Sequence, residues 1–209
     1  MRLLPNLIAA IGAMAMLAAS SLPGGAHEGH EHESDAAAAP APAPSPDQDQ
    51  ALEYFTDLPV TTQDGQTLRF YSDVLKDKVL LVSLFYTSCK GACPVTTAKM
   101  AAVQELLGED FGRRIHFVSI TVDPENDTPA VIRDYAAQFG ARDGWLFLTG
   151  DQEDLRTIAY RLGHRHENVE AHPPLYLVAD TRRGYWRKLM PNVATEPLAE
   201  MLRILADGA

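Results

Sequence analysis

Two thiols are the groups in this chain best suited to do chemistry. Cys89 and Cys93 are the only cysteines among 209 residues, and three residues separate them. A pair of thiols at this spacing can cycle between dithiol and disulfide, or it can hold a soft metal ion such as copper(I). A purely structural disulfide is a third reading. It fits less well, because structural cysteines are usually buried and inert rather than placed at a turn.

The elements on either side of the thiols place them at the start of a helix. The apolar run 78–86 predicts a strand that is buried on both faces. After the cysteines, Pro94 suits the first helical position, and Met100, Val103 and Leu107 follow at helical spacing. Backbone N–H groups at a helix N-terminus favour thiolate over thiol, so we expect a reactive pair.

The rest of the chain alternates strands with helices. This order predicts an α/β fold with a central mixed sheet flanked by helices and an N-terminal β-hairpin. The layout, with the cysteine turn at the first main helix, resembles the thioredoxin-like fold. The expected elements are a hairpin of 58–62 and 67–71, strand 114–122, a helix opened by Asp127-Thr128-Pro129 and ended by Gly140, strand 145–148, a helix capped by Asp151, an antiparallel pair of 175–179 and 185–189, and a helix from Thr195.

Copper(I) accepts two thiolates and one imidazole, so a metal site here would need a histidine from elsewhere in the chain. His172 is the one that topology aims at the sulfurs, because it precedes strand 175–179, and the loop entering that strand should face the cysteine turn. His116 lies within a strand and is expected to be a satisfied sheet-face residue. His164 and His166 follow a helix end and are expected in a polar surface loop.

Other residues that could bind a metal have simpler explanations. Met100 continues the apolar stripe of its helix and is expected in the core, and Met190, near the last strand, is likewise not expected to bind a metal. Asp123 and Asp127 could suggest a carboxylate site, but capping and turn formation explain them without chemistry.

Several motifs together resemble the Sco/SenC family. They are Phe85-Tyr86-Thr87-x-Cys89-x-x-x-Cys93-Pro94, Ser119-Ile120-Thr121-Val122-Asp123-Pro124-x-x-Asp127-Thr128-Pro129, Tyr135-Ala136-x-x-Phe139-Gly140, 145–150, and a late histidine before a strand. The resemblance implies a thioredoxin-like domain that binds copper through Cys89, Cys93 and His172. It also implies a role in building the dinuclear copper centre of cytochrome c oxidase, by metal delivery or by reducing that centre's cysteines.

Two departures from the family pattern keep the thiol chemistry open. Lys90-Gly91-Ala92 replaces the usual residues between the cysteines, and Pro173-Pro174 follows His172 where Ser or Thr is usual. Pro174 falls where thioredoxins keep a cis-proline beside their disulfide. The alternative function is therefore a thiol–disulfide oxidoreductase, with Cys89 and Cys93 as its redox pair, so enzymatic activity is left open.

The N-terminal quarter of the chain has the organisation of an exported protein. Residues 1–26 read as a secretory signal peptide, whose apolar stretch is shorter than the ~20 residues of a membrane span, although an uncleaved anchor remains the alternative. Residues 27–51 read as a disordered linker rich in His, Ala and Pro, and its His27, His30 and His32 could scavenge metal. The copper-binding domain is expected over 52–209, in the periplasm or facing it at the inner membrane.

Composition narrows the partners. The chain has 46% hydrophobic residues, which is ordinary for a folded domain. Its formal net charge of -10 argues against binding to nucleic acid, which favours basic surfaces. The expected partner is the copper-site subunit of cytochrome c oxidase, another exported cuproprotein or a copper chaperone. Contact with a membrane is expected only through an uncleaved N-terminal anchor.

Overall fold

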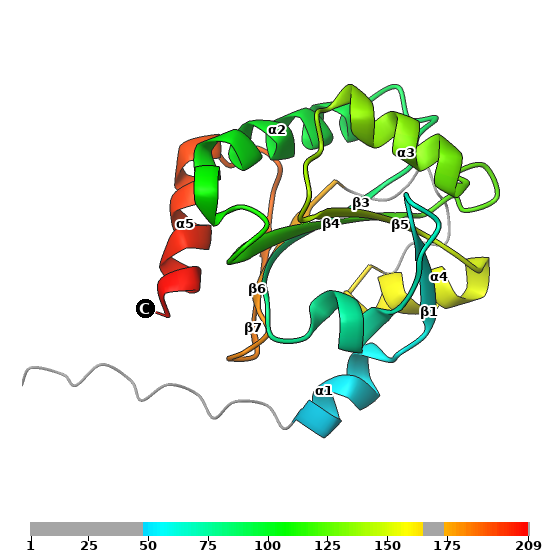
Figure 1. Cartoon of the computed structure of the whole chain (residues 1–209), viewed down its shortest axis with the longest axis horizontal. Helices are drawn as coiled ribbons and strands as arrows, with labels where there is room; N and C mark the ends of the chain where they lie inside the picture. Colours follow the sequence, from blue (N-terminus) through cyan, green and yellow to red (C-terminus); the bar gives the residue numbers. More distant parts are fainter. Residues whose placement is uncertain (1–47, 165–173, 209) are drawn as a thin grey trace, which may run out of the picture. The chain divides into compact units, whose positions relative to one another are not determined.

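The computed structural model describes residues 48–164 and 174–208, which form a seven-stranded sheet with helices on both faces (Figure 1). The strand order is β2-β1-β5-β4-β3-β6-β7. The elements are α1 Gln48–Phe55, β1 Pro59–Thr62, β2 Thr67–Arg69, the π-helical turn η1 Phe70–Leu75, β3 Val79–Phe85, α2 Ala92–Leu107, the 3-10 turn η2 Gly108–Asp110, β4 Ile115–Thr121, α3 Pro129–Gln138, β5 Trp145–Thr149, α4 Gln152–Arg161, β6 Tyr176–Asp180, β7 Tyr185–Leu189 and α5 Thr195–Asp207.

The sheet is mixed, as the sequence predicts. Strands β3, β4 and β5 are parallel neighbours, while β6 pairs antiparallel with β3 and β1 pairs antiparallel with β5. The predicted hairpin is present as β1 and β2, and the predicted antiparallel pair as β6 and β7. The α/β prediction is therefore confirmed.

Helices α2, α3 and α5 cover one face of the sheet, and α1, η1 and α4 cover the other (Figure 1). Successive side chains of β3 alternate between the two cores: Val79, Leu81 and Phe85 pack under α2, and Leu80 and Val82 pack against the opposite layer. This strand is buried along its whole length, as a continuous apolar run predicts for a central strand.

The register brings three chain segments to one edge of the sheet. Phe85 at the end of β3 pairs with Thr121 at the end of β4. Because β6 runs antiparallel to β3, it begins at the same edge, with Tyr176 opposite Ser83. The cysteine turn therefore leaves the sheet beside the point where β6 enters it, which is the arrangement the topological argument requires.

Some local features differ from the sequence expectations. Helix α2 begins at Ala92 rather than at Pro94, which is the third residue of its first turn, where a missing N–H costs no helical bond. Helix α1 starts at Gln48 and so spans the predicted boundary at Leu52. The sequence did not predict this helix, because its amphipathic pattern is short and the residues it packs against are distant in sequence. Among the described residues, no helix has the length and apolar character needed to cross a membrane.

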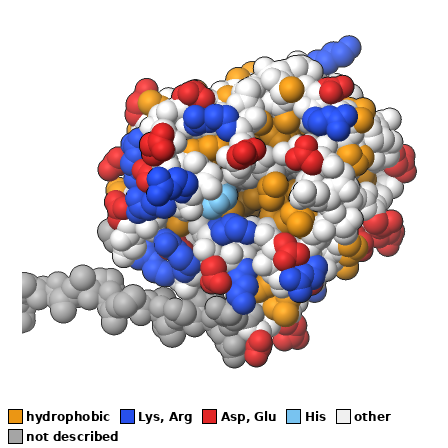
Figure 2. Space-filling view, in the orientation of Figure 1, with side chains coloured by type: hydrophobic (Ala, Val, Ile, Leu, Met, Phe, Trp, Pro, Cys, Tyr) orange, Lys and Arg blue, Asp and Glu red, His pale blue; other side chains and the backbone are white. Residues whose placement is uncertain are grey.

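Charges of both signs are interspersed over the face drawn in Figure 2. Ion pairs also occur among the described residues: Arg114 contacts both Asp110 and Asp207, and Arg203 contacts Glu200.

Candidate metal and redox site

The first turn of α2 holds the two sulfurs in different environments. Gly91 is the N-cap residue, and the Cys93 backbone N–H points out of the helix end and donates to the Cys89 sulfur at 3.4 Å. Cys89 thus occupies the place of a capping acceptor, where partial positive charge from the helix gathers. Both thiols are free, with Cys89 half-buried and Cys93 buried.

This placement lowers the pKa of one thiol and raises that of the other. Partial burial opposes ionisation of Cys89, but hydrogen bonds from the Cys93 N–H and thiol and from the Gly91 N–H outweigh it, so the Cys89 pKa lies below its ordinary value. Burial, then hydrogen bonding to Cys89, raises the pKa of Cys93 to about 12. The helix N-terminus therefore stabilises one thiolate, at Cys89, rather than both.

A buried phenol lies near the pair. The ring of Tyr135 stacks on Phe85 at 5.3 Å, and its hydroxyl shares a hydrogen bond of 3.1 Å with Thr97. Burial, with a smaller contribution from the charge of Cys93 and Cys89, raises the pKa of Tyr135 to about 12. The Tyr135 phenol therefore carries no charge at neutral pH, and its ring belongs to the same apolar core cluster as Cys93.

Asp127 does not act as the predicted helix cap. Thr128 is the N-cap residue of α3, and the Asp127 side chain is fully buried and turned toward the cysteine segment. Its carboxylate accepts hydrogen bonds from the Thr87 backbone N–H, the Thr87 hydroxyl and the Thr121 hydroxyl. Sequence reasoning missed this contact because an Asp just before a helix can either cap the helix or accept hydrogen bonds from buried groups. The pairing of Thr87 with Asp127 is visible only when β3 and β4 are adjacent.

Strand β6 is tied to the helix that carries Cys93. The buried Tyr176 hydroxyl donates to the Thr96 carbonyl of α2 at 2.9 Å. His172 lies outside the described residues, four positions before Tyr176. Its role as a ligand stays a prediction.

The other histidines lie in different settings. His164 is buried at 7% exposure and does not lie in a surface loop as expected. Its backbone N–H donates to the Ala159 carbonyl in the last turn of α4. His116 is a half-buried strand residue whose pKa is lowered by burial and then by Lys78. Its Nδ1 has no hydrogen-bond partner among the described residues, so the expected full satisfaction is not met. His166 lies outside the described residues.

Of the two methionines considered as ligands, Met100 is fully buried in the core, as expected. Met190, just after β7, is 62% exposed. The described ranges 48–164 and 174–208 contain no cluster of three His, Cys, Asp or Glu side chains arranged for a metal.

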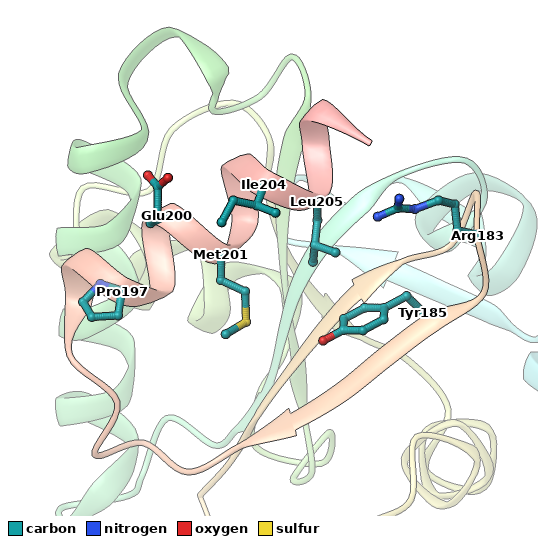
Figure 3. A pocket seen from close by; sticks show the side chains of 7 residues that line it. All are labelled: Arg183, Tyr185, Pro197, Glu200, Met201, Ile204 and Leu205. Carbon is teal, nitrogen blue, oxygen red and sulfur yellow. The ribbon is translucent and has the colours of Figure 1, made fainter. Parts of the chain in front are cut away.

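A separate surface pocket lies along the exposed side of α5 (Figure 3). Its volume is about 520 Å³, and it opens between α5 and the β6–β7 turn. Because Tyr185 pairs with Asp180, which in turn pairs with Val79, this lining lies at the opposite end of β3 from the cysteines. The residues that line it are Arg183, Tyr185, Pro197, Glu200, Met201, Ile204 and Leu205.

Comparison with known proteins decides the family. The SCO1/SenC family profile matches residues 46–199, which include both cysteines, Asp127 and the segment before β6. The chain belongs to the SCO1/SenC family.

Individual relatives agree with this assignment. The chain is 37% identical over 102 residues to the SCO1 protein homolog of Bacillus subtilis, covering 47% of this chain and 51% of that one. This SCO1/SenC chain spans about half the length of the curated relatives it matches. BsSco, described as a Sco-family cytochrome c oxidase assembly protein with a disulfide switch, superposes with a TM-score of 0.63 at 23% identity over 73% of this chain and 93% of its own. Bradyrhizobium japonicum ScoI, solved with copper bound, superposes with a TM-score of 0.59 at 24% identity, over 69% of this chain and 94% of its own. At these identities both structures support the thioredoxin-like fold.

The donors of this SCO1/SenC chain suit copper. Two free thiols at one helix turn are soft ligands, and thiolates select Cu(I) over the hard cations that prefer carboxylates. The half-buried Cys89 keeps one side of the pair open, so a ligand from a partner protein can approach.

Proposed function

We propose that this chain binds one copper ion through the Cys89 and Cys93 thiolates and the His172 imidazole. In this proposal it serves as a metallochaperone that assembles the copper centre of cytochrome c oxidase. The observation that carries the proposal is the free dithiol at the start of α2, in a chain of the SCO1/SenC family. The antiparallel entry of β6 at the same edge supports His172 as the third ligand.

Each ligand would have its own task. Cys89, with its lowered pKa and partial exposure, would bind incoming copper first and exchange it with a partner. Cys93 would lose its proton only as copper replaces it, since burial raises its pKa. The partner would be the copper-site subunit of the oxidase, another exported cuproprotein or a copper chaperone. These proteins would be met in the periplasm or on the periplasmic side of the inner membrane, reached by the signal in residues 1–26.

Anaerobic Cu(I) titration of the reduced full chain against a competing chelator tests the proposal. We expect one tight copper per chain in wild type, no tight copper in Cys89→Ala, and affinity weakened about tenfold or more in His172→Ala. His166→Ala is the matched control, because it removes a histidine from the same segment, and it should bind like wild type. Each variant is also made with His27, His30 and His32 changed to Ala, so that copper on the linker is not counted. Equal affinity in wild type, Cys89→Ala and His172→Ala would refute the proposal.

A second candidate function is thiol–disulfide reduction, favoured by the unequal thiols. The Cys89 thiolate would attack a partner's disulfide, forming a mixed disulfide and releasing one partner thiolate. Cys93, after losing its proton, would then attack the Cys89 sulfur. This closes the Cys89–Cys93 disulfide and releases the second thiolate, so the partner gains two electrons. Trapping a mixed disulfide with Cys93→Ser, together with full cellular function of His172→Ala, would favour this reading over copper delivery.

A further inference from the structure

Asp127 is a fully buried carboxylate on the connection between β4 and α3. Burying a carboxylate costs several kcal/mol unless charges or hydrogen bonds compensate it. Among the described residues, no Lys, Arg or His forms an ion pair with Asp127. Three donors from two threonines compensate it instead, with the Thr87 N–H at 3.2 and 3.3 Å from the two oxygens.

The contact joins two strand ends across the top of the sheet. Thr87 follows β3, and Thr121 is the last residue of β4, paired in register with Phe85. The Val122 N–H also donates to the Phe85 carbonyl at 2.9 Å. A capping side chain would lie at the surface, whereas this one sits below the loop and binds both strands.

The same contact fixes the base of the cysteine loop. Thr87 lies two residues before Cys89, whose N–H closes a turn onto the Tyr86 carbonyl at 3.3 Å. Ser88 and Lys90, on either side of Cys89, are exposed. Cys93 is held by the core and by α2, so the position of Cys89 relative to it depends on the anchor at Thr87.

We propose that Asp127 is a positioning residue for the dithiol. Through Thr87 and Thr121 it holds Cys89 against the start of α2, so that both sulfurs are ready to bind one metal ion or to close a disulfide. Outer-shell groups of this kind typically change metal affinity 10–100-fold when removed. The inference rests on the proposed function for its copper readout only, because disulfide closure tests it without metal.

Two measurements on the full chain test the role. The first is Cu(I) affinity by chelator competition, and the second is the equilibrium of the Cys89–Cys93 disulfide with glutathione. Asp127→Asn keeps the shape but places a donor where one acceptor was, and we expect both constants to fall about tenfold or more, because freeing the loop lowers the effective concentration of one sulfur at the other. Thr87→Val should show a smaller loss, and Thr87→Ser should behave like wild type.

Asp180→Asn is the matched control. Asp180 is another fully buried carboxylate, but it pairs with Val79 at the opposite end of β3, roughly 20 Å away along the strand. It should lose stability while both constants stay within about twofold of wild type. The proposal would be overturned if Asp127→Asn leaves the Cu(I) affinity and the glutathione equilibrium unchanged, or if Asp180→Asn lowers both by as much as Asp127→Asn does. If wild type binds no copper, the proposed function fails, and the glutathione equilibrium still decides the role of Asp127. If Asp127→Asn does not fold, the Thr87→Val and Thr87→Ser pair decides it.

Discussion

Tyr176 and Thr96 join the last part of the sheet to the helix that carries Cys93. The buried Tyr176 hydroxyl donates to the Thr96 carbonyl at 2.9 Å, although the two residues lie 80 positions apart. Tyr176 opens β6, and Thr96 lies in the first turns of α2. This single bond therefore couples the two segments from which the candidate ligands come.

Removing that bond should loosen both segments. We expect Tyr176→Phe to lower the free energy of unfolding by about 1 kcal/mol, the usual net worth of a buried hydrogen bond. Hydrogen–deuterium exchange should become faster at the start of β6 and in the first turns of α2. Tyr135→Phe is the control: it loses the bond to Thr97 but no link to β6. Equal exchange changes in both variants would contradict a specific link between β6 and α2.

The two thiols should react in a fixed order. At pH 7.5 iodoacetamide should modify Cys89 well before Cys93, because only Cys89 is partly exposed and has a lowered pKa. The Cys89 rate should level off at a lower pH than that of an ordinary thiol, whose pKa is about 8.5. The Cys93 rate should still rise near pH 11, since its pKa is about 12. Peptide mapping by mass spectrometry gives both rates, and comparable rates at neutral pH would refute the asymmetry.

Asp180 should make stability depend on acid pH. Burial opposes its ionisation, but hydrogen bonding and the charge of Arg182, then Arg183, lower its pKa below the ordinary value. Because the Asp180 pKa is lower in the folded protein than in the unfolded chain, ionisation stabilises the fold at pH values above the unfolded pKa of about 4. This contribution is lost as the pH falls through the pKa of the folded protein. Arg182 and Arg183 also donate to the Leu205 and Gly208 carbonyls at the end of α5.

We therefore expect Asp180→Asn to cost about 1.5–3 kcal/mol at pH 7, the range for a hydrogen bond to a charged group, and to flatten the fall in stability as the pH drops below the unfolded pKa of about 4. Urea unfolding at several pH values measures this. Glu153→Gln, which removes an exposed carboxylate that pairs with Arg156, should change little. An unchanged acid profile in Asp180→Asn would contradict the prediction.

A buried hydroxyl pair supports the core near β5. The Trp145 indole N–H donates to the Ser119 hydroxyl at 3.0 Å, and Ser119 shares a hydrogen bond of 3.1 Å with Ser83. Ser119→Ala should cost about 1–3 kcal/mol, because it leaves the indole N–H without its acceptor. Ser83→Ala removes one bond of the pair, leaves the Trp145 bond intact, and should cost less. Chemical unfolding followed by tryptophan fluorescence compares them, and equal losses would contradict the ranking.

The sequence predicted the elements better than the contacts between them. The apolar run of β3, the cap at Asp151 and the first-turn proline at Pro129 are local signals, and each predicted element is present within a few residues. Helix α1 and the π-helical turn η1 were missed because short elements depend on tertiary packing more than on pattern.

The candidate site shows the same division. The dithiol and its helix follow from a few adjacent residues, whereas the roles of Asp127 and Tyr176 depend on which strands become neighbours. His164 illustrates the converse error: a histidine after a helix end looked like a loop residue, but the chain turned it inward. Local spacing therefore predicts which groups could react, whereas the residues that contact their segments become apparent only from the fold.

The late position of β6 in the chain has a consequence for biogenesis. The dithiol is synthesised long before β6, which must pair with β3 before the sheet is complete. Pairing between segments so distant in sequence forms slowly compared with local helices. Until it forms, a folding chain presents both thiols without the strand that follows His172. Oxidants and stray metals therefore compete for an unfinished site, and the speed of β6 docking sets how long that competition lasts.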